Sequence, residues 1–170
     1  FFDNMSHELL EKALERHVPE KWVKMYITRW LKAPIEDESG NKRYRNGKGT
    51  PQGGVVSPLL ANLFLHYAFD KWFDKKFPGL GFVRYADDII VHCHSQEESE
   101  SVLRCIKARL SQCGLEANEK KTKIVYCKHA YRRGKFRTVQ FDFLGFSFQP
   151  RPTANKRGQM FLGFDCAISR

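Results

Sequence analysis

The stretch GFVRYADDIIVHC, residues 81–93, places two adjacent acids in a segment that otherwise has the apolar composition of a buried strand. Neighbouring side chains of a continuous strand point to opposite faces, so either Asp87 or Asp88 would face the core at a high desolvation cost. A turn removes this conflict. We therefore predict a hairpin with FVRY and IIVH as its strands and both acids at its exposed tip.

Two carboxylates held side by side repel each other until a divalent cation neutralises them, and carboxylate oxygens are ligands that Mg²⁺ prefers. The ordinary alternative for an Asp-Asp dipeptide is a solvent-exposed turn that binds nothing. The segments that flank Asp87 and Asp88 are too apolar for a simple surface hairpin. The sequence therefore favours a metal-binding turn.

The chain has 170 residues, enough for one domain with a real core, and a formal net charge of +10. This charge predicts a polyanionic partner, because neutralising a phosphate releases a condensed counterion. Nucleic acid is the first candidate and an anionic membrane surface the second. The sequence has no run of about 18 apolar residues and opens with no signal-peptide pattern. We therefore expect an intracellular, cytoplasmic protein without a membrane partner.

The five cysteines form no C-x-x-C pair and are odd in number, so neither a zinc ribbon nor a disulfide framework is indicated. We expect reduced and mostly packed thiols. His92 and His94 would share one face of the second hairpin strand. A zinc site there would need further ligands that the sequence does not identify, so we interpret both as structural histidines.

Hydrophobic spacing predicts four helices. Ser6 can cap the first, and Pro19 suits the first turn of the second. Residues 59–73 have the spacing of a third helix, and an S-x-x-E capping box at Ser95 opens a fourth, which Gly114 closes.

Residues 36–50 are polar and Gly-rich, as in a loop or a solvated hairpin. TKIVYC, VQFDFLGFSFQ and MFLGF supply later strands. No repeat or linker divides the chain, so the order predicts a single α+β domain.

Five motifs follow one another along nearly the whole chain: FFDNMSHELL at 1–10, GTPQGGVVSPLLANLFL at 49–65, YADD at 85–88, GLEANEKKTKI at 114–124 and FDFLGF at 141–146. Together they resemble the motifs of group II intron-encoded reverse transcriptases. The resemblance implies the palm of a right-hand polymerase, with adjoining finger helices, that copies RNA into DNA. It also implies an RNA template, a DNA primer, deoxynucleoside triphosphates and structured intron RNA as partners, and association with a ribonucleoprotein or the nucleoid.

The resemblance sets expectations for the extent of the domain. Residues 1–170 would be the palm with part of the fingers, without the thumb/maturase domain and the N-terminal fingers. The family's first-motif Asp would lie upstream of Phe1, so we expect this chain alone to be inactive, and its exposed palm edge to favour self-association. Asp3 is better interpreted as a local turn or capping acid than as a substitute ligand.

Catalytic roles follow from the same resemblance. In-line attack of a primer 3′ oxygen on a triphosphate needs two metal ions and carboxylates that hold them. Asp87 is implied as the principal ligand of two Mg²⁺ ions, with Asp88 as its partner. Lys121 is implied near the triphosphate, where a cation can neutralise the leaving pyrophosphate or give it a proton. Lys120 is the less favoured neighbour, and a solvated lysine is the alternative for either.

Nucleotide- and template-binding roles are implied for four residues. Phe2 matches an aromatic residue under the nucleotide sugar, where a bulky ring would clash with a 2′-hydroxyl; a plain core aromatic is the alternative. Gln52 would contact the incoming nucleotide or the templating strand, and Gly53 would let the backbone approach the substrate. Tyr85, the first residue of YADD, completes this group.

Two later segments are implied in binding nucleic acid. FLGF resembles the hairpin that steadies the primer end, through Phe143, Leu144 and Gly145, with a core strand as the alternative. Residues 128–137, KHAYRRGKFR, mix cations with aromatic rings, a composition suited to phosphates and stacked bases. The cations expected to bind RNA there are Lys128, Arg132, Arg133, Lys135 and Arg137. A solvated basic loop is the alternative.

Two other functions stay open. One is a non-catalytic scaffold that binds intron RNA, as in the maturase role of these proteins. The other is a related enzyme of a retron or a diversity-generating element. The intact Asp87 and Asp88 favour polymerisation over a degenerate scaffold, and the motif sequence TPQGGVVSPLLAN favours the group II type.

Overall fold

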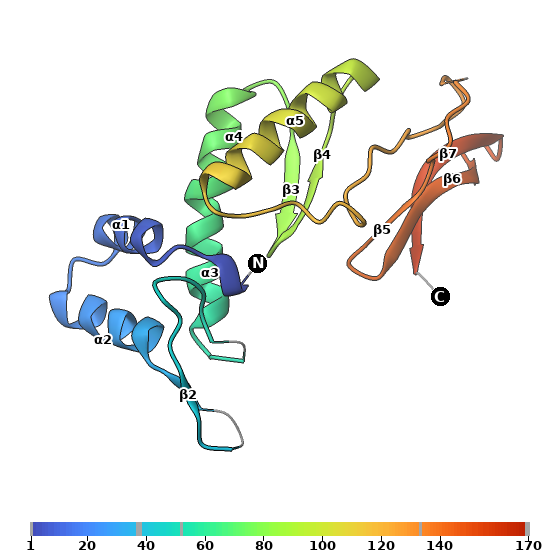
Figure 1. The fold of residues 1–170 in the computed structure, drawn as a ribbon. Coiled ribbons are helices and arrows are strands. Elements are labelled where there is room, and N and C mark those ends of the chain that lie inside the picture. The colour runs from blue at the N-terminus through green and yellow to red at the C-terminus, as the bar shows by residue number, and fades with distance from the viewer. Residues whose placement is uncertain (1, 37–38, 52, 133, 169–170) are drawn as a thin grey trace. The chain divides into compact units, whose positions relative to one another are not determined.

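The computed structural model describes residues 2–36, 39–51, 53–132 and 134–168 (Figure 1). The chain folds as two compact units, Phe1–Asn118 and Glu119–Arg170, a division that the sequence pattern does not predict because no change of composition marks it. Helices and antiparallel strands occur together, so the predicted α+β class is confirmed.

The first unit opens with a short 3₁₀ turn, η1 (Phe2–Asn4), and two helices, α1 (His7–His17) and α2 (Lys21–Lys32). The side chain of Ser6 accepts a hydrogen bond from the backbone N–H of Leu9, so the predicted cap is confirmed. Pro19 is not in the first turn of α2. It precedes the N-cap Glu20, whose extended backbone delays the start of the helix to Lys21.

The predicted third helix is continuous in sequence but has three parts: α3 (Ser57–Leu65), η2 (His66–Asp70) and α4 (Lys71–Lys76). The η2 segment is a π-helical turn, in which the N–H of Lys71 donates to the carbonyl of His66 five residues earlier. Hydrophobic spacing predicts one continuous helix here and does not predict this turn.

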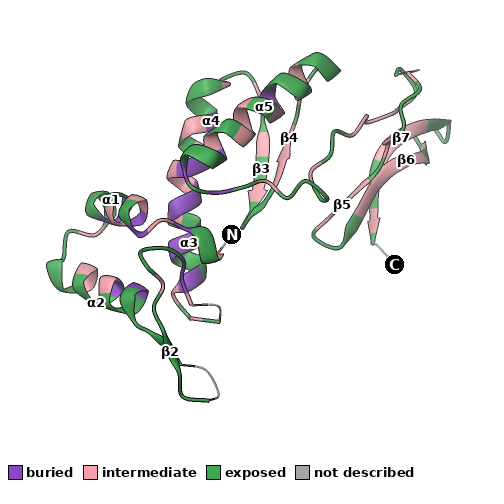
Figure 2. Cartoon of the chain, viewed as in Figure 1, coloured by how far each residue is buried: buried purple, intermediate pink, exposed green. Residues whose placement is uncertain are grey.

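Two hydrophobic clusters form the core of the first unit. The larger joins α1, α2, α3 and the end of α5 (Gln96–Gln112), and includes the fully buried Met5 and Leu10. The smaller surrounds Phe69 and Phe73, which stack with ring centroids 5.3 Å apart. Figure 2 shows the buried residues concentrated along the α3–α4 helix and on the inner faces of α1 and α2.

The predicted hairpin is formed by β3 (Phe82–Tyr85) and β4 (Asp88–Val91), which pair antiparallel. Phe82, Ile89 and Val91 pack against the smaller cluster, so one face of the hairpin is covered by α4 and α5. At the start of α5, Ser95 accepts from the N–H of Glu98, and Gly114 after the helix has a φ of 73°. Both predicted ends of this helix are confirmed.

The segment expected to be a loop or a solvated hairpin contains one short exposed pair, β1 (Ile35–Glu36) with β2 (Lys42–Arg43). The rest of the segment is irregular where the structure describes it. No helix in the described residues is both long and apolar enough to span a lipid bilayer.

The second unit is built on a three-stranded antiparallel sheet of β5 (Phe141–Phe143), β6 (Phe146–Ala154) and β7 (Met160–Ile168). These strands contain the predicted FDFLGF and MFLGF segments. The predicted strand at TKIVYC is wrong: residues 122–127 form no ladder. The N–H of Tyr126 donates to the carbonyl of Thr138, a contact that closes a loop instead of extending a sheet.

Candidate active site

The two acids lie where the hairpin turns. Asp87 is in the turn itself and Asp88 is the first residue of β4, paired across the hairpin with Tyr85. All three side chains are exposed, Tyr85 by 63%. Ala86 has a φ of 52°, which places the first residue of the turn in the left-handed region that glycine usually occupies. The predicted exposed tip is confirmed, and its backbone is strained at Ala86.

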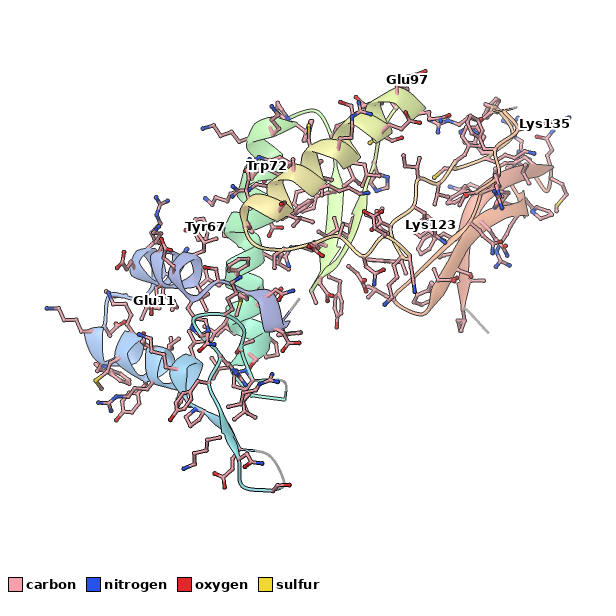
Figure 3. The ribbon with its side chains drawn as sticks, in the orientation of Figure 1. Glu11, Tyr67, Trp72, Glu97, Lys123 and Lys135 are labelled. Carbon is pink, nitrogen blue, oxygen red and sulfur yellow. The ribbon has the colours of Figure 1, made fainter. Side chains whose placement is uncertain are left out.

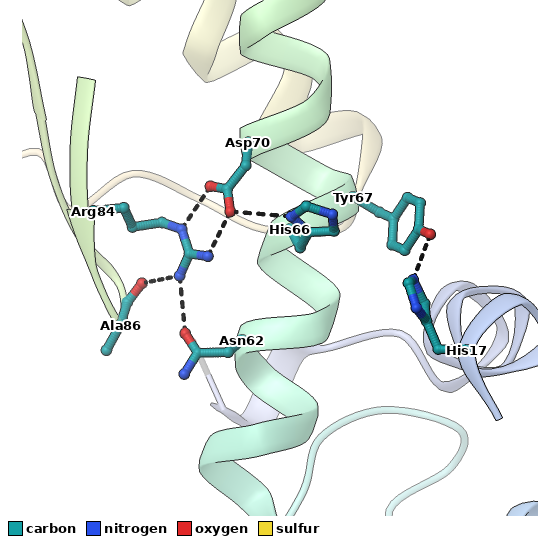
Figure 4. A network of polar contacts seen from close by, with 7 residues as sticks. All are labelled: His17, Asn62, His66, Tyr67, Asp70, Arg84 and Ala86. Atoms are coloured by element: carbon teal, nitrogen blue, oxygen red, sulfur yellow. Dashed lines mark hydrogen bonds and ion pairs between the residues drawn. The ribbon is translucent and has the colours of Figure 1, made fainter. Parts of the chain in front are cut away.

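Behind this tip, Arg84 joins the hairpin to the π-helical turn (Figure 4). Its Nε and Nη2 donate to the two carboxylate oxygens of Asp70, each at 2.6 Å. Its Nη1 donates to Asn62 Oδ1 at 2.9 Å and to the carbonyl of Ala86 at 2.8 Å. One guanidinium therefore binds two residues of the helix, through three hydrogen bonds, and the carbonyl of Ala86 in the strained turn. The network adds His66, whose Nδ1 lies 3.5 Å from Asp70.

Phe2 lies against the start of the glycine-rich motif. Its carbonyl accepts a hydrogen bond from the N–H of Thr50 at 3.0 Å, and the N–H of Gly49 donates to the carbonyl of Met5 at 2.8 Å. The ring of Phe2 is half-buried. Two motifs that are far apart in the sequence are thus joined through their backbones.

The glycine-rich loop also has internal supports. Ser57 is buried, and its hydroxyl donates to the carbonyl of Pro51 at 2.6 Å and lies 3.0 Å from the hydroxyl of Thr50. Gly53 has a φ of 79°, and a Cβ added there would have no atom within 4 Å, so its backbone is open on that side. Gln52 lies outside the described residues.

The remaining predicted site residues belong to the second unit. Leu144 and Gly145 have φ values of 51° and 79° and form the two-residue turn between β5 and β6, with Phe143 paired to Phe146. Residues of a two-residue turn with both φ values positive match a type I′ hairpin. Lys121 is exposed in the irregular segment before β5.

Residues 128–132 and 134–137 are irregular, and two contacts hold this basic segment in place. The rings of Tyr126 and Phe136 stack with centroids 4.2 Å apart, and the N–H of Ala130 donates to the carbonyl of Leu162 in β7. Lys128 is half-buried, whereas Arg132, Lys135 and Arg137 are exposed. Figure 3 shows Lys135 on this loop. Arg133 lies outside the described residues.

The donor set at the tip fits a hard divalent cation in part. Asp87 and Asp88 offer exposed carboxylate oxygens, the ligand type of Mg²⁺. Within the described ranges, no cluster of three or more His, Cys, Asp and Glu side chains is arranged to hold a metal. His92 and His94 are both exposed, and His94 Nδ1 pairs with Glu98 at 3.2 Å. Nearby, burial raises the pKa of the Cys93 thiol.

Arg84, Asp70 and Asn62 are not predicted by the sequence patterns above. The sequence does hold a signal for Arg84. It lies in an apolar strand, on the face opposite Tyr85 that packs on the helices, and a buried cation needs an anionic partner. Spacing does not identify that partner, which lies 14 residues earlier on a helix.

Comparison with known proteins identifies the class. The family model described as "Reverse transcriptase (RNA-dependent DNA polymerase)" matches residues 1–148, which include the hairpin, the glycine-rich motif and the β5–β6 turn. The chain belongs to this family.

Individual relatives show which kinds of reverse transcriptase the chain is similar to. It is 39% identical over 66 residues to the group II intron-encoded protein LtrA of Lactococcus lactis, covering 38% of this chain and 10% of the relative. It is 24% identical over 203 residues to the COX1/OXI3 intron 1 protein of Saccharomyces cerevisiae, covering 89% and 23%. A retron Se72 reverse transcriptase of Salmonella heidelberg is 34% identical over 82 residues, covering 46% and 22%. The predicted resemblance to group II intron-encoded reverse transcriptases is confirmed. The chain spans less than a quarter of the length of these relatives.

Proposed function

We propose that this chain is the palm, with adjoining finger helices, of an RNA-directed DNA polymerase of the group II intron type. The observation that carries the proposal is the pair Asp87 and Asp88, exposed at the tip of a hairpin whose other side is anchored by Arg84 and a packed aromatic cluster. Membership of the reverse transcriptase family supports the same reading.

In the proposed reaction, the primer 3′ oxygen attacks the α-phosphorus of a deoxynucleoside triphosphate. A new O–P bond forms, the bond to the bridging oxygen breaks, and pyrophosphate leaves while the primer hydroxyl loses its proton. Asp87 and Asp88 would hold two Mg²⁺ ions. When bound, these ions stabilise the charge that develops on the attacking and leaving oxygens. The carboxylates suit this role because they are exposed and adjacent.

Other residues of the chain would orient the substrates. Phe2, joined to the glycine-rich loop through Thr50, would exclude a 2′-hydroxyl, and Gly53 with Gln52 would approach the nucleotide or template. Tyr85 is exposed and pairs with Asp88 across the hairpin, so it would lie beside the bound nucleotide.

Further substrate contacts are proposed for residues of the second unit. Lys121 would neutralise or protonate the departing pyrophosphate. The turn at Phe143, Leu144 and Gly145 would steady the primer. The exposed cations of residues 128–137 would bind RNA phosphates, in keeping with the charge of +10 and with a ribonucleoprotein location.

A non-catalytic RNA-binding scaffold is the second candidate, favoured by the exposed basic loop. Primer extension separates the two functions. The protein expressed from the complete open reading frame should extend a DNA primer on an RNA template with Mg²⁺, stop when the metal is chelated, and resume when Mg²⁺ is restored. Tight binding of structured RNA without any extension would contradict the polymerase and support the scaffold.

A further inference from the structure

We propose that Arg84 is a positioning residue, which fixes the turn bearing Asp87 and Asp88 to the long helix formed by α3, η2 and α4. This inference rests on the proposed metal-binding role of the two acids. Arg84 would fix the turn through all of its contacts together, which are those with Asp70, Asn62 and the carbonyl of Ala86.

The backbone of the turn needs a contact that holds it. Ala86 precedes Asp87 directly, and its left-handed φ of 52° is unfavourable for a residue with a side chain. Such a conformation persists only where surrounding contacts enforce it. The hydrogen bond from Arg84 Nη1 to the Ala86 carbonyl, 2.8 Å long, is a contact of this kind. It acts on the backbone of the turn, so it constrains the carboxylate that follows.

The long helix is shaped to receive this arginine. Residues eight apart on a regular α-helix differ by about 80° around its axis, so the side chains of Asn62 and Asp70 would be offset from each other on the helix surface. The π-helical turn between them is wider and changes this offset. In the structure both side chains accept hydrogen bonds from the same guanidinium. Asn62, one turn before the π segment, and Asp70, within it, thus form one acceptor pair for Arg84.

The positive charge of Arg84 is neutralised by Asp70, away from the hairpin turn. The side chain of Arg84 is only 11% exposed and that of Asp70 18% exposed, so an unpaired charge at either position would be costly. Their bidentate pairing neutralises the guanidinium. Arg84 can thus approach the turn without presenting a full positive charge that would compete with a metal ion for Asp87 and Asp88.

A metal titration tests this role without relying on activity. Tb³⁺ serves as the probe, and the exposed Tyr85 beside Asp88 serves as its sensitiser. We expect Arg84→Gln to weaken Tb³⁺ binding about 10- to 100-fold, the usual effect of losing a residue that orients a metal ligand. In the protein from the complete open reading frame, the Mg²⁺ concentration for half-maximal primer extension should rise similarly, with RNA affinity retained.

Arg109 offers a matched control. It is a part-buried arginine of α5 whose Nε and Nη2 donate to the carbonyls of Ala68 and Tyr67, within the same π-helical segment, but it does not bond the hairpin turn. Arg109→Gln should lower the thermal midpoint without weakening Tb³⁺ binding. Equal metal affinity in Arg84→Gln and Arg109→Gln would overturn the inference.

Two further variants keep the test decisive. Arg84→Lys retains the charge beside Asp70, but one ammonium cannot reproduce the fork that also reaches Asn62 and Ala86. If Arg84→Gln does not fold, Arg84→Lys should still bind Tb³⁺ several-fold more weakly than the wild type, and unchanged binding would overturn the inference. Asp87→Asn separates the two proposals: if it leaves Tb³⁺ binding intact, the metal site itself is wrong.

Discussion

The imidazole Nε2–H of His7 donates to the carbonyl oxygen of Gly49 at 2.6 Å, which ties the start of α1 to the glycine-rich motif. His7 is buried, and Gly49 has a φ of 80°. A Cβ at Gly49 would lie 2.9 Å from the carbonyl oxygen of Asp3. The loop can therefore approach the first turn only because residue 49 has no side chain.

Gly49→Ala should consequently destabilise the first unit by more than the backbone strain alone. Gly40→Ala is the matched control, since Gly40 has nearly the same φ of 81° with nothing within 4 Å of the added atom. We expect Gly40→Ala to lower the free energy of unfolding by about 1–2 kcal/mol, and Gly49→Ala by clearly more. Equal losses in urea unfolding would show that the contact with Asp3 is unimportant.

The strained turn provides another stability test. Ala86→Val should lower the free energy of unfolding by about 1–2 kcal/mol, because a β-branched side chain tolerates a positive φ poorly. Ala33→Val is the control, since Ala33 is exposed with an ordinary φ of −58°. Ala86→Gly should be tolerated. A value for Ala86→Val as small as that of Ala33→Val would refute the strain.

The β3–β4 hairpin can be predicted from the sequence because its cause is local. An apolar strand cannot hold two adjacent acids, so the turn had to lie between Tyr85 and Asp88. The caps at Ser6 and Ser95 were predictable for the same reason, since each side chain bonds a backbone N–H three residues away.

Contacts between distant segments were not predictable from one sequence. The pairing of Arg84 with Asp70 depends on how the hairpin packs on the helix, and the wide turn at η2 leaves no periodic signal. TKIVYC has the composition of a strand but finds no partner strand within the described residues, so tertiary context overrides its propensity.

The basic loop predicts a salt-dependent interaction with RNA. Replacing Arg132 and Lys135 together with Gln should weaken binding to a labelled intron RNA fragment and reduce the slope of log affinity against log salt by about 0.7–0.9 for each phosphate that is no longer neutralised. Lys75→Gln with Lys76→Gln, exposed lysines of α4, makes the same change of charge elsewhere. Equal effects of the two pairs would argue against a specific role of the loop.

Thiol reactivity should follow burial. Burial raises the pKa values of the Cys113 and Cys127 thiols above that of an exposed cysteine, so at pH 8 less of each thiol is the reactive thiolate than in the unfolded chain. Their alkylation curves should therefore shift to higher pH on folding. The exposed Cys166 should react first with iodoacetamide and the buried Cys113 last, as followed by mass spectrometry. Labelling of Cys113 as fast as Cys166 would contradict the packing described here.

If Asp87 and Asp88 hold the catalytic metal ions, DNA synthesis must depend on the charge of each carboxylate. The measurement is the rate of Mg²⁺-dependent primer extension on an RNA template by Asp87→Asn, in the protein from the complete open reading frame. An amide cannot replace an anionic ligand, so we predict a loss of about a thousandfold or more with RNA affinity nearly unchanged. Asp74→Asn, at an exposed acid of α4, should extend normally. Near-normal extension by Asp87→Asn would contradict the account.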